Sequence, residues 1–310
     1  MGETKKKPYY KSDTCEVSRM ENETGDGIST AFRVFPGIYL LHSDFHMQEC
    51  PTVKSDDVDI LWLDFCREGR VEWEISKDKY VYLESGNYVI DIRAGRKFTL
   101  HFPMGHYHGI SLRIHMKEAN QALADFIKGV NIDVYTIRDK FLSEGQPFIT
   151  KGNEIIHHIF EEIEQVPWDS SGEYYKIKVL EILFQLKNME RPKEQIERPY
   201  FVKQQVEIVK EIRDFITASP EQHYTMEELS KRFEIPVSSL KRCFKGVYGT
   251  AIYSFMRSYR MDMAGHLLAE TVAAIAVKVG YTNCSKFSEA FKEATGMTPI
   301  DYRKFKSHRE

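Results

Sequence analysis

The sequence lacks the features that mark secreted, membrane-spanning or disulfide-linked proteins. No stretch approaches the ~18 consecutive apolar residues of a transmembrane helix, and Met1 to Lys7 has no apolar run of a secretory signal. The five cysteines are odd in number, scattered and without CxxC spacing, so neither a disulfide framework nor a cysteine zinc site is expected. These absences predict a cytoplasmic protein with reduced thiols and no membrane contact.

Charge is distributed unevenly along the 310 residues of the chain. The net charge of −3 would by itself argue against nucleic-acid binding. Residues 201–310, however, contain 17 Lys and Arg against 13 Asp and Glu, which gives +4, whereas residues 1–200 carry −7. This modest basic excess predicts weak, salt-sensitive non-specific binding to DNA by the last third of the chain.

A first helix-turn-helix pattern begins at Thr225. Thr225 followed three residues later by Glu228 is a capping box, which marks a helix start. Pro236 follows that helix, and a further helix ends near Gly249. The apolar stripe of this second helix is formed by Leu240, Cys243 and Phe244. Its polar and basic residues therefore face outward, as in a helix that lies in the major groove of DNA.

A second pattern of the same kind follows in the last 40 residues. Small apolar residues from Val272 to Val279 predict a short helix, which Gly280 ends at a position suited to left-handed backbone. The next helix runs from Cys284 to Thr295, and its inward residues are Phe287, Ala290, Phe291 and Ala294. One helix from Ile252 to Ala269 joins the two patterns and is expected to hold them at a fixed separation.

Residues from about 201 to 306 resemble the DNA-binding domain of the AraC/XylS family of transcription regulators. The family signature has a glycine turn, an aromatic core and a Gly-x-[ST]-Pro exit. These stand here as Val279-Gly280-Tyr281, Lys286-Phe287-Ser288, Ala290-Phe291-Lys292, Gly296-Met297-Thr298-Pro299 and Tyr302-Arg303. The resemblance implies an all-α double helix-turn-helix domain in a cytoplasmic bacterial regulator that is not an enzyme. Such a regulator binds double-stranded DNA, acts with RNA polymerase and is in most family members an activator.

The same resemblance identifies the side chains that would contact DNA. Arg242 is the strongest candidate for base reading, because a guanidinium pairs with both O6 and N7 of guanine. Lys245, Lys286 and Lys292 are expected to meet phosphate, although any single lysine could equally be a solvated helix-face residue. Glu289 departs from the family, and a carboxylate cannot approach phosphate favourably, so the second pattern should contribute less affinity. Glu289 is still a candidate for base reading, because its carboxylate could accept a hydrogen bond from cytosine N4. The remaining candidates are Ser238, Ser239, Lys241, Cys284, Ser285 and Ser288.

From Phe32 to His115 the sequence favours β-structure. Short runs of alternating, β-branched and aromatic residues are separated by glycine-containing breaks, one of them Arg67 to Arg70, which predicts an antiparallel meander in a barrel or sandwich. The segment from Asp59 to Ile114 resembles a cupin, with Pro103-Met104-Gly105 at the Pro-x-Gly hairpin. The expected fold class is therefore α+β in two domains, with an N-terminal cupin-like β-barrel and following helices.

The predicted barrel supplies candidate contacts for a small-molecule effector. Small barrels can hold one ligand, and aromatic residues of the strands either line such a cavity or simply fill it. The candidates are Trp62, Trp73, Tyr88, His106 and His108. His101, His106 and His108 also invite a metal interpretation. Since no His-x-His followed by a glutamate occurs in the earlier strands, neither a metal nor another cofactor is expected.

Helical periodicity follows the predicted barrel. From Glu173 to Met189, one stripe is formed by Tyr175, Val179, Ile182 and Leu186. It predicts contact with the barrel core or, as in the family, pairing of two subunits in a homodimer. Glu190 to Gln195 is charged and contains proline, which predicts a linker. The expected domains are an N-terminal tail (1–30), a cupin-like sensor and dimerisation domain (31–190), a linker (191–199) and an AraC-type DNA-binding domain (200–306).

Three functions are compatible with these patterns. The favoured one is a sequence-specific transcription regulator, an activator controlled by a small-molecule effector in the barrel. The second is a regulator that responds to a protein partner or acts constitutively, with the barrel as a dimerisation scaffold. The third is a cupin metal enzyme with a DNA-binding tail, which would require a bound metal ion.

Overall fold

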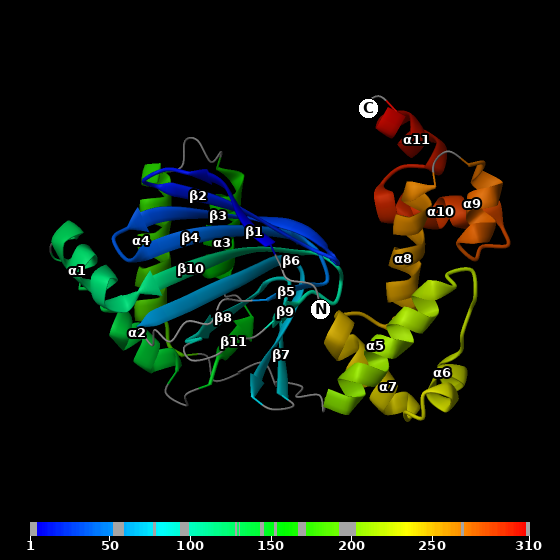
Figure 1. Ribbon diagram of the computed structural model, residues 1–310, viewed down its shortest axis with the longest axis horizontal. Coiled ribbons are helices and arrows are strands. Elements are labelled where there is room, and N and C mark those ends of the chain that lie inside the picture. The colour runs from blue at the N-terminus through cyan, green and yellow to red at the C-terminus, as the bar shows by residue number, and fades with distance from the viewer. Residues whose placement is uncertain are drawn as a thin grey trace. The chain divides into compact units, whose positions relative to one another are not determined.

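The computed structural model describes residues 5–51, 59–76, 79–93, 99–127, 129, 131–142, 146–151, 154–166, 172–191, 203–267 and 270–307. The chain divides into two compact units, Met1–Tyr200 and Phe201–Glu310 (Figure 1). The first unit combines an antiparallel half-barrel with helices and the second is helical, which confirms the predicted fold class. The predicted linker, residues 191–199, lies outside the described residues except for Arg191.

The strands of the first unit pair antiparallel in the order β1-β2-β3-β4-β10-β6-β8-β11, while β7 and β9 also pair with β6, and β5 pairs with β9. Their bounds are β1 Lys5–Lys11, β2 Cys15–Asn22, β3 Gly25–Phe35, β4 Ile38–His46, β5 Glu49–Pro51, β6 Ile60–Ser76, β7 Lys79–Glu84, β8 Asn87–Asp91, β9 Thr99–His101, β10 Tyr107–His115 and β11 Phe148–Lys151.

The predicted N-terminal tail of residues 1–30 is wrong, because β1, β2 and most of β3 lie there. These strands are joined to the sheet through backbone pairing, with β2 between β1 and β3. In β2 only Ser18 is buried, so the strand has no apolar face for a hydrophobic alternation to reveal. Backbone pairing at a sheet edge therefore left little signal in the sequence.

The predicted meander and the predicted break at Arg67 to Arg70 are also wrong. β10 lies between β4 and β6, so the last long strand is inserted between two earlier ones. β6 continues through the expected break as a single strand of 17 residues. Arg67 is left out of the register with β10, as in a β-bulge, and Gly69 has a left-handed φ of +80°. A bulge and a glycine bend the strand here without ending it.

Two apolar cores lie on opposite faces of the sheet. In β6, Leu61, Leu63 and Phe65 belong to the core shared with the helices. Cys66, Val71 and Trp73 of the same strand belong to the core inside the half-barrel. Successive residues such as Phe65 and Cys66 point to opposite faces, and the bulge at Arg67 shifts the alternation so that Val71 and Trp73 lie on the face of Cys66. One long strand therefore supplies both cores, and its sequence shows little simple alternation.

Four helices share one apolar core with the sheet: α1 Met116–Phe126, α2 Val134–Phe141, α3 Glu154–Gln165 and α4 Gly172–Asn188. Helices α3 and α4 lie behind the sheet in Figure 1, and α1 and α2 lie at its left end. The helix α2 and the strand β11 were not predicted. The stripe Tyr175, Val179, Ile182 and Leu186 of α4 is buried in the core with the sheet, so the interpretation as core contact is confirmed. Homodimerisation stays a prediction, and it would need another face of the helices, where Ile177 and Phe184 are exposed.

The second unit contains seven helices in its described part: α5 Lys203–Ala218, α6 Met226–Arg232, α7 Val237–Tyr248, α8 Ile252–His266, α9 Val272–Lys278, α10 Cys284–Thr295 and α11 Pro299–Ser307. The predicted end of the connecting helix at Ala269 lies outside the described residues, and α8 ends at His266. Helix α8 contacts α5, α7 and α10, so it joins both helix-turn-helix units. The units are α6 with α7, and α9 with α10.

Candidate nucleic-acid interface

The first helix-turn-helix unit, α6 with α7, begins with the predicted capping box. The Thr225 hydroxyl accepts from the Glu228 backbone N–H at 3.1 Å, and the Glu228 carboxylate accepts from the Thr225 backbone N–H at 2.8 Å. These hydrogen bonds lower the pKa of Glu228. Two of the free N–H groups at the helix start are thereby satisfied, which fixes where α6 begins.

Helix α7 exposes a basic face above a buried one. Leu240, Cys243 and Phe244 are fully buried, as predicted, and Gly249 ends the helix with a left-handed φ of +74°. Ser239 is half-buried, whereas the exposed candidates are Ser238, Lys241, Arg242 and Lys245. The helix contains no Asp or Glu, so its exposed face carries three positive charges and no negative one.

Helices α9 and α10 have side-chain caps that were not predicted. The Thr271 hydroxyl accepts from the Ala274 N–H at 3.2 Å, and the Asn283 side chain accepts from the N–H groups of Ser285 and Lys286. Thr and Asn are preferred at this position, so the sequence does carry a signal for both caps. Asn283 thus serves the helix start and is not a free candidate for base contact.

Helix α10 exposes a face without net charge. Ser288 is half-buried, whereas the exposed candidates are Cys284, Ser285, Lys286, Glu289 and Lys292. Phe287, Ala290 and Phe291 are buried as predicted, but the prediction for Ala294 is wrong, because it is exposed near the helix end. Glu293 on the exposed side pairs with Arg257 of α8. Two lysines and two glutamates balance along this helix.

Arg260 of α8 connects the two helix-turn-helix units through the loop between α5 and α6. The buried guanidinium donates to the carbonyl oxygens of Pro220 (2.7 Å) and Gln222 (2.9 Å), and burial lowers its pKa. His223 Nε2 lies 2.8 Å from the Gly280 carbonyl oxygen, which only accepts, so Nε2 carries the proton. The unprotonated Nδ1 then accepts from Arg260 at 3.4 Å.

Gly280 completes this connection. Its φ is +81°, and a Cβ at this position would lie 2.9 Å from the Glu221 carbonyl oxygen. The sequence predicted a glycine turn here, but not that the turn touches the loop before the first unit. No sequence signal distinguishes Arg260 from the other arginines, because its partners are backbone carbonyls 38 and 40 residues away.

Comparison with known proteins identifies the C-terminal unit, which contains both helix-turn-helix units. Residues 229–304 match the protein family described as Helix-turn-helix domain. A protein of Streptomyces antibioticus provisionally named AraC-like transcription regulator is 34% identical over 93 residues, 29% of this chain and 31% of that protein. The HTH-type transcriptional activator RhaR of Mannheimia succiniciproducens is 30% identical over 91 residues, 28% of this chain and 33% of that protein. The C-terminal unit is an AraC-type helix-turn-helix domain.

Solved structures similar to the AraC-type domain include the C-terminal domain of AraT, a response regulator of Geobacillus stearothermophilus. It is 30% identical, with 32% of this chain and 84% of that chain covered and a TM-score of 0.31. The chain spans about a third of the length of the Streptomyces and Mannheimia relatives. The sequence similarity lies in the C-terminal unit, and the two relatives that share it are named as transcription regulators.

The predicted effector contacts in the N-terminal unit do not lie together at one site. Trp73 is buried in the core inside the half-barrel, whereas Tyr88 is buried in the core under the helices. The ring of Trp62 is half-buried, with the Arg93 guanidinium 4.7 Å from the ring centre. His106 and His108 are half-buried at the end of the sheet, beside Glu68 and Asp44. Effector binding by these five residues stays a prediction.

No helix in the described part of the chain is both long enough and apolar enough to cross a lipid bilayer. The sheet brings together three potential metal ligands, Asp44, His46 and His108, although the sequence pattern predicted no metal site. Two of them form an Asp-x-His pattern in β4, which differs from the His-x-His pattern on which that prediction depended.

Proposed function

We propose that the chain is a sequence-specific transcription regulator that reads two adjacent major-groove segments with α7 and α10. The observation that carries this proposal is the exposure of nearly every predicted contact residue on these two helices above buried apolar faces. If both helices enter the groove on one face of the duplex, their contacts lie about 34 Å, or one helical turn, apart. Helix α8 and the Arg260 hydrogen bonds favour such a fixed spacing.

We further propose that the N-terminal unit controls DNA binding through a small-molecule effector, and that the regulator activates transcription with RNA polymerase in the bacterial cytoplasm. Activation is supported by the name of RhaR, a transcriptional activator that shares this domain. Binding of the intact chain to its operator with and without cell extract tests effector control. Binding that extract does not change would favour a constitutive regulator or one that responds to a protein partner.

The base-reading role of Arg242 gives the sharpest test of DNA recognition. An operator selected from random duplexes by the intact chain would be compared for binding to the Arg242→Ala and Lys245→Ala variants. We expect Arg242→Ala to lose about 1–3 kcal/mol at the selected site and to relax one base position. Lys245→Ala should weaken binding to all sequences by a similar factor, because phosphate contacts carry no sequence information.

The matched measurement is selection repeated with each variant. Base preference that is unchanged in Arg242→Ala would show that this arginine does not read a base. If the unaltered chain selects no sequence at any salt concentration, the proposal of sequence-specific regulation is wrong.

A further inference from the structure

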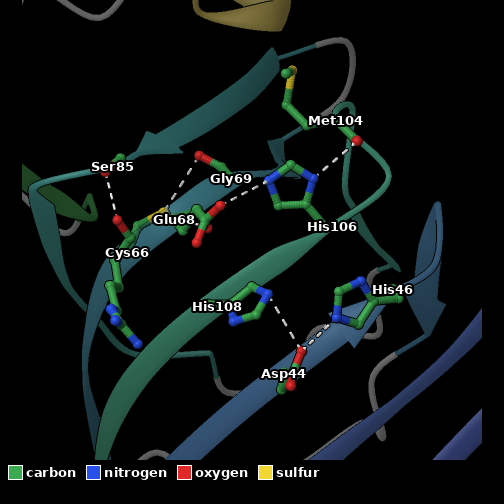
Figure 2. Close-up of polar contacts among 10 residues, drawn as sticks. Asp44, His46, Cys66, Glu68, Gly69, Ser85, Met104, His106 and His108 are labelled. Carbon is green, nitrogen blue, oxygen red and sulfur yellow. Dashed lines mark hydrogen bonds and ion pairs between the residues drawn. The ribbon is translucent and has the colours of Figure 1, made fainter. Parts of the chain in front are cut away.

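A row of polar side chains crosses the sheet at the end that the helices leave uncovered. Asp44 on β4 is the register partner of His108 on β10, and His108 is the register partner of Glu68 on β6. His46 lies two residues beyond Asp44 on the same strand, so both side chains point to the same face. Figure 2 shows the rings of His46 and His108 directed at the Asp44 carboxylate.

The distances match those between ligands of a single metal ion. The Oδ1 atom of Asp44 lies 3.0 Å from His46 Nε2 and 3.4 Å from His108 Nε2. One ligand atom from each residue can be chosen so that all three lie within 4.8 Å of one another. Around a tetrahedral zinc ion with bonds near 2.1 Å, ligand atoms lie about 3.4 Å apart. The Asp44 Oδ1 atom is therefore close to such a separation from both imidazole nitrogens.

Charge also favours a cation between these side chains. The rings of His46 and His108 have centroids 5.3 Å apart and are nearly perpendicular, at 88°. Two imidazolium rings at this distance would repel each other. One divalent cation bound by two neutral imidazoles and the carboxylate places a single centre of positive charge among three electron-pair donors.

We propose that Asp44, His46 and His108 bind one divalent transition-metal cation of the zinc, cobalt or nickel class. Two imidazole nitrogens and one carboxylate oxygen suit these ions, whereas calcium and magnesium prefer sites built from oxygen atoms. The side chains of Asp44 and His46 are 57% and 63% exposed, so the ion reaches the site from solvent. Three protein ligands leave a coordination position open to water, unlike the closed four-ligand sites that hold structural zinc.

His106 provides a neighbouring group for this site. Its ring lies 6.3 Å from that of His108, between centroids, and its Nε2 lies 3.9 Å from Glu68 Oε1. The binding of the cation goes beyond the proposed function and does not depend on it, because the N-terminal unit contains the whole site. An exchangeable ion here is suited to sensing and not to holding the fold together.

The test is a titration of the intact, untagged chain with Co²⁺, followed by its visible d–d absorption, and with Zn²⁺ by calorimetry. We expect one ion per chain and no competition by Mg²⁺. His46→Ala and His108→Ala should each weaken Co²⁺ binding by at least about tenfold. Asp44→Asn keeps the size of the side chain and should also weaken binding.

His158→Ala is the matched control, because His158 is an exposed histidine 3.6 Å from Glu162 and, among the residues that the structure describes, belongs to no group of three potential ligands. This variant should bind Co²⁺ as the unaltered chain does. Circular dichroism spectra that match across the variants would show that each one folds. The proposal is wrong if the unaltered chain binds no Co²⁺ at millimolar concentration, or if both cluster variants keep full affinity.

Discussion

The two helix-turn-helix units share a plan but differ in the charge of the helix that each one exposes. Helix α7 carries Lys241, Arg242 and Lys245 and no acidic residue, whereas the lysines of α10 are balanced by Glu289 and Glu293. Phosphate neutralisation sets non-specific affinity, so α7 should supply most of it. Helix α10 is better suited to contribute register and base contacts, since its exposed face combines small side chains with charges of both signs.

The units also differ in how they are attached. Through Gly280, the second helix-turn-helix unit contacts the loop that precedes the first helix-turn-helix unit. Arg260 donates hydrogen bonds to two carbonyl oxygens of that loop. The first unit is defined mainly by local features, its capping box and its left-handed Gly249. The spacing of the units therefore depends on a few backbone contacts, whereas the charge of each unit can be changed separately.

The largest expected effect is that of Gly280→Ala. A Cβ here combines a positive φ with a 2.9 Å approach to a backbone oxygen that cannot easily move. We expect the free energy of unfolding of the C-terminal unit to fall by about 3 kcal/mol, measured by far-UV circular dichroism in urea. Gly296→Ala is the control, since its φ is +76° but no atom lies within 4 Å, and about 1 kcal/mol is expected. Equal losses would mean that the contact with Glu221 is unimportant.

Arg260→Met should have the next largest effect. It keeps the apolar part of the side chain but leaves the carbonyls of Pro220 and Gln222 without their donor, at a cost of about 2 kcal/mol. The variant should lose more affinity for DNA that contains both major-groove segments than for DNA that contains only one of them. Arg257→Met on the same helix serves as control, because Arg257 is exposed and pairs only with Glu293 among the described ion pairs. An equal loss of affinity for one-segment and two-segment DNA would argue against a role of Arg260 in spacing the two helices.

Paired lysine substitutions compare the two exposed helices directly. Lys241→Gln with Lys245→Gln should reduce the slope of log Kd against log salt concentration by about two. The pair Lys286→Gln with Lys292→Gln should reduce it by less, because the nearby carboxylates already weaken the attraction of α10 for phosphate. The slopes come from titrations at several salt concentrations, and a larger change for the second pair would reverse the comparison.

The smallest expected effect is that of Glu289→Gln. Removal of this exposed negative charge should strengthen binding to non-specific DNA by about twofold, most clearly at low salt. Glu227→Gln on α6 is the control, because this exposed glutamate belongs to neither recognition helix. Weaker binding to one particular base pair in the operator would instead indicate that Glu289 accepts a hydrogen bond from cytosine.

Local sequence is enough to specify the short-range features of the C-terminal unit. The capping box at Thr225, the buried stripe of α7 and the glycines that end helices are fixed by residues within one or two helical turns. Their physical causes are short-range: the helical period, the capping of free N–H groups and the chirality that reserves positive φ for glycine. The same reasoning identified most of the exposed residues on α7 and α10, but it placed Ala294 of α10 inward.

Which distant residues meet depends on the tertiary fold. The insertion of β10 between β4 and β6 brings His108 beside Asp44, and the bulge at Arg67 with the bend at Gly69 lets one strand serve two cores. Arg260 reaches the loop before α6 in the same way. Strand order and contacts to backbone carbonyls depend on chain segments far apart in sequence. No local period or motif records them, because backbone groups are the same at every residue.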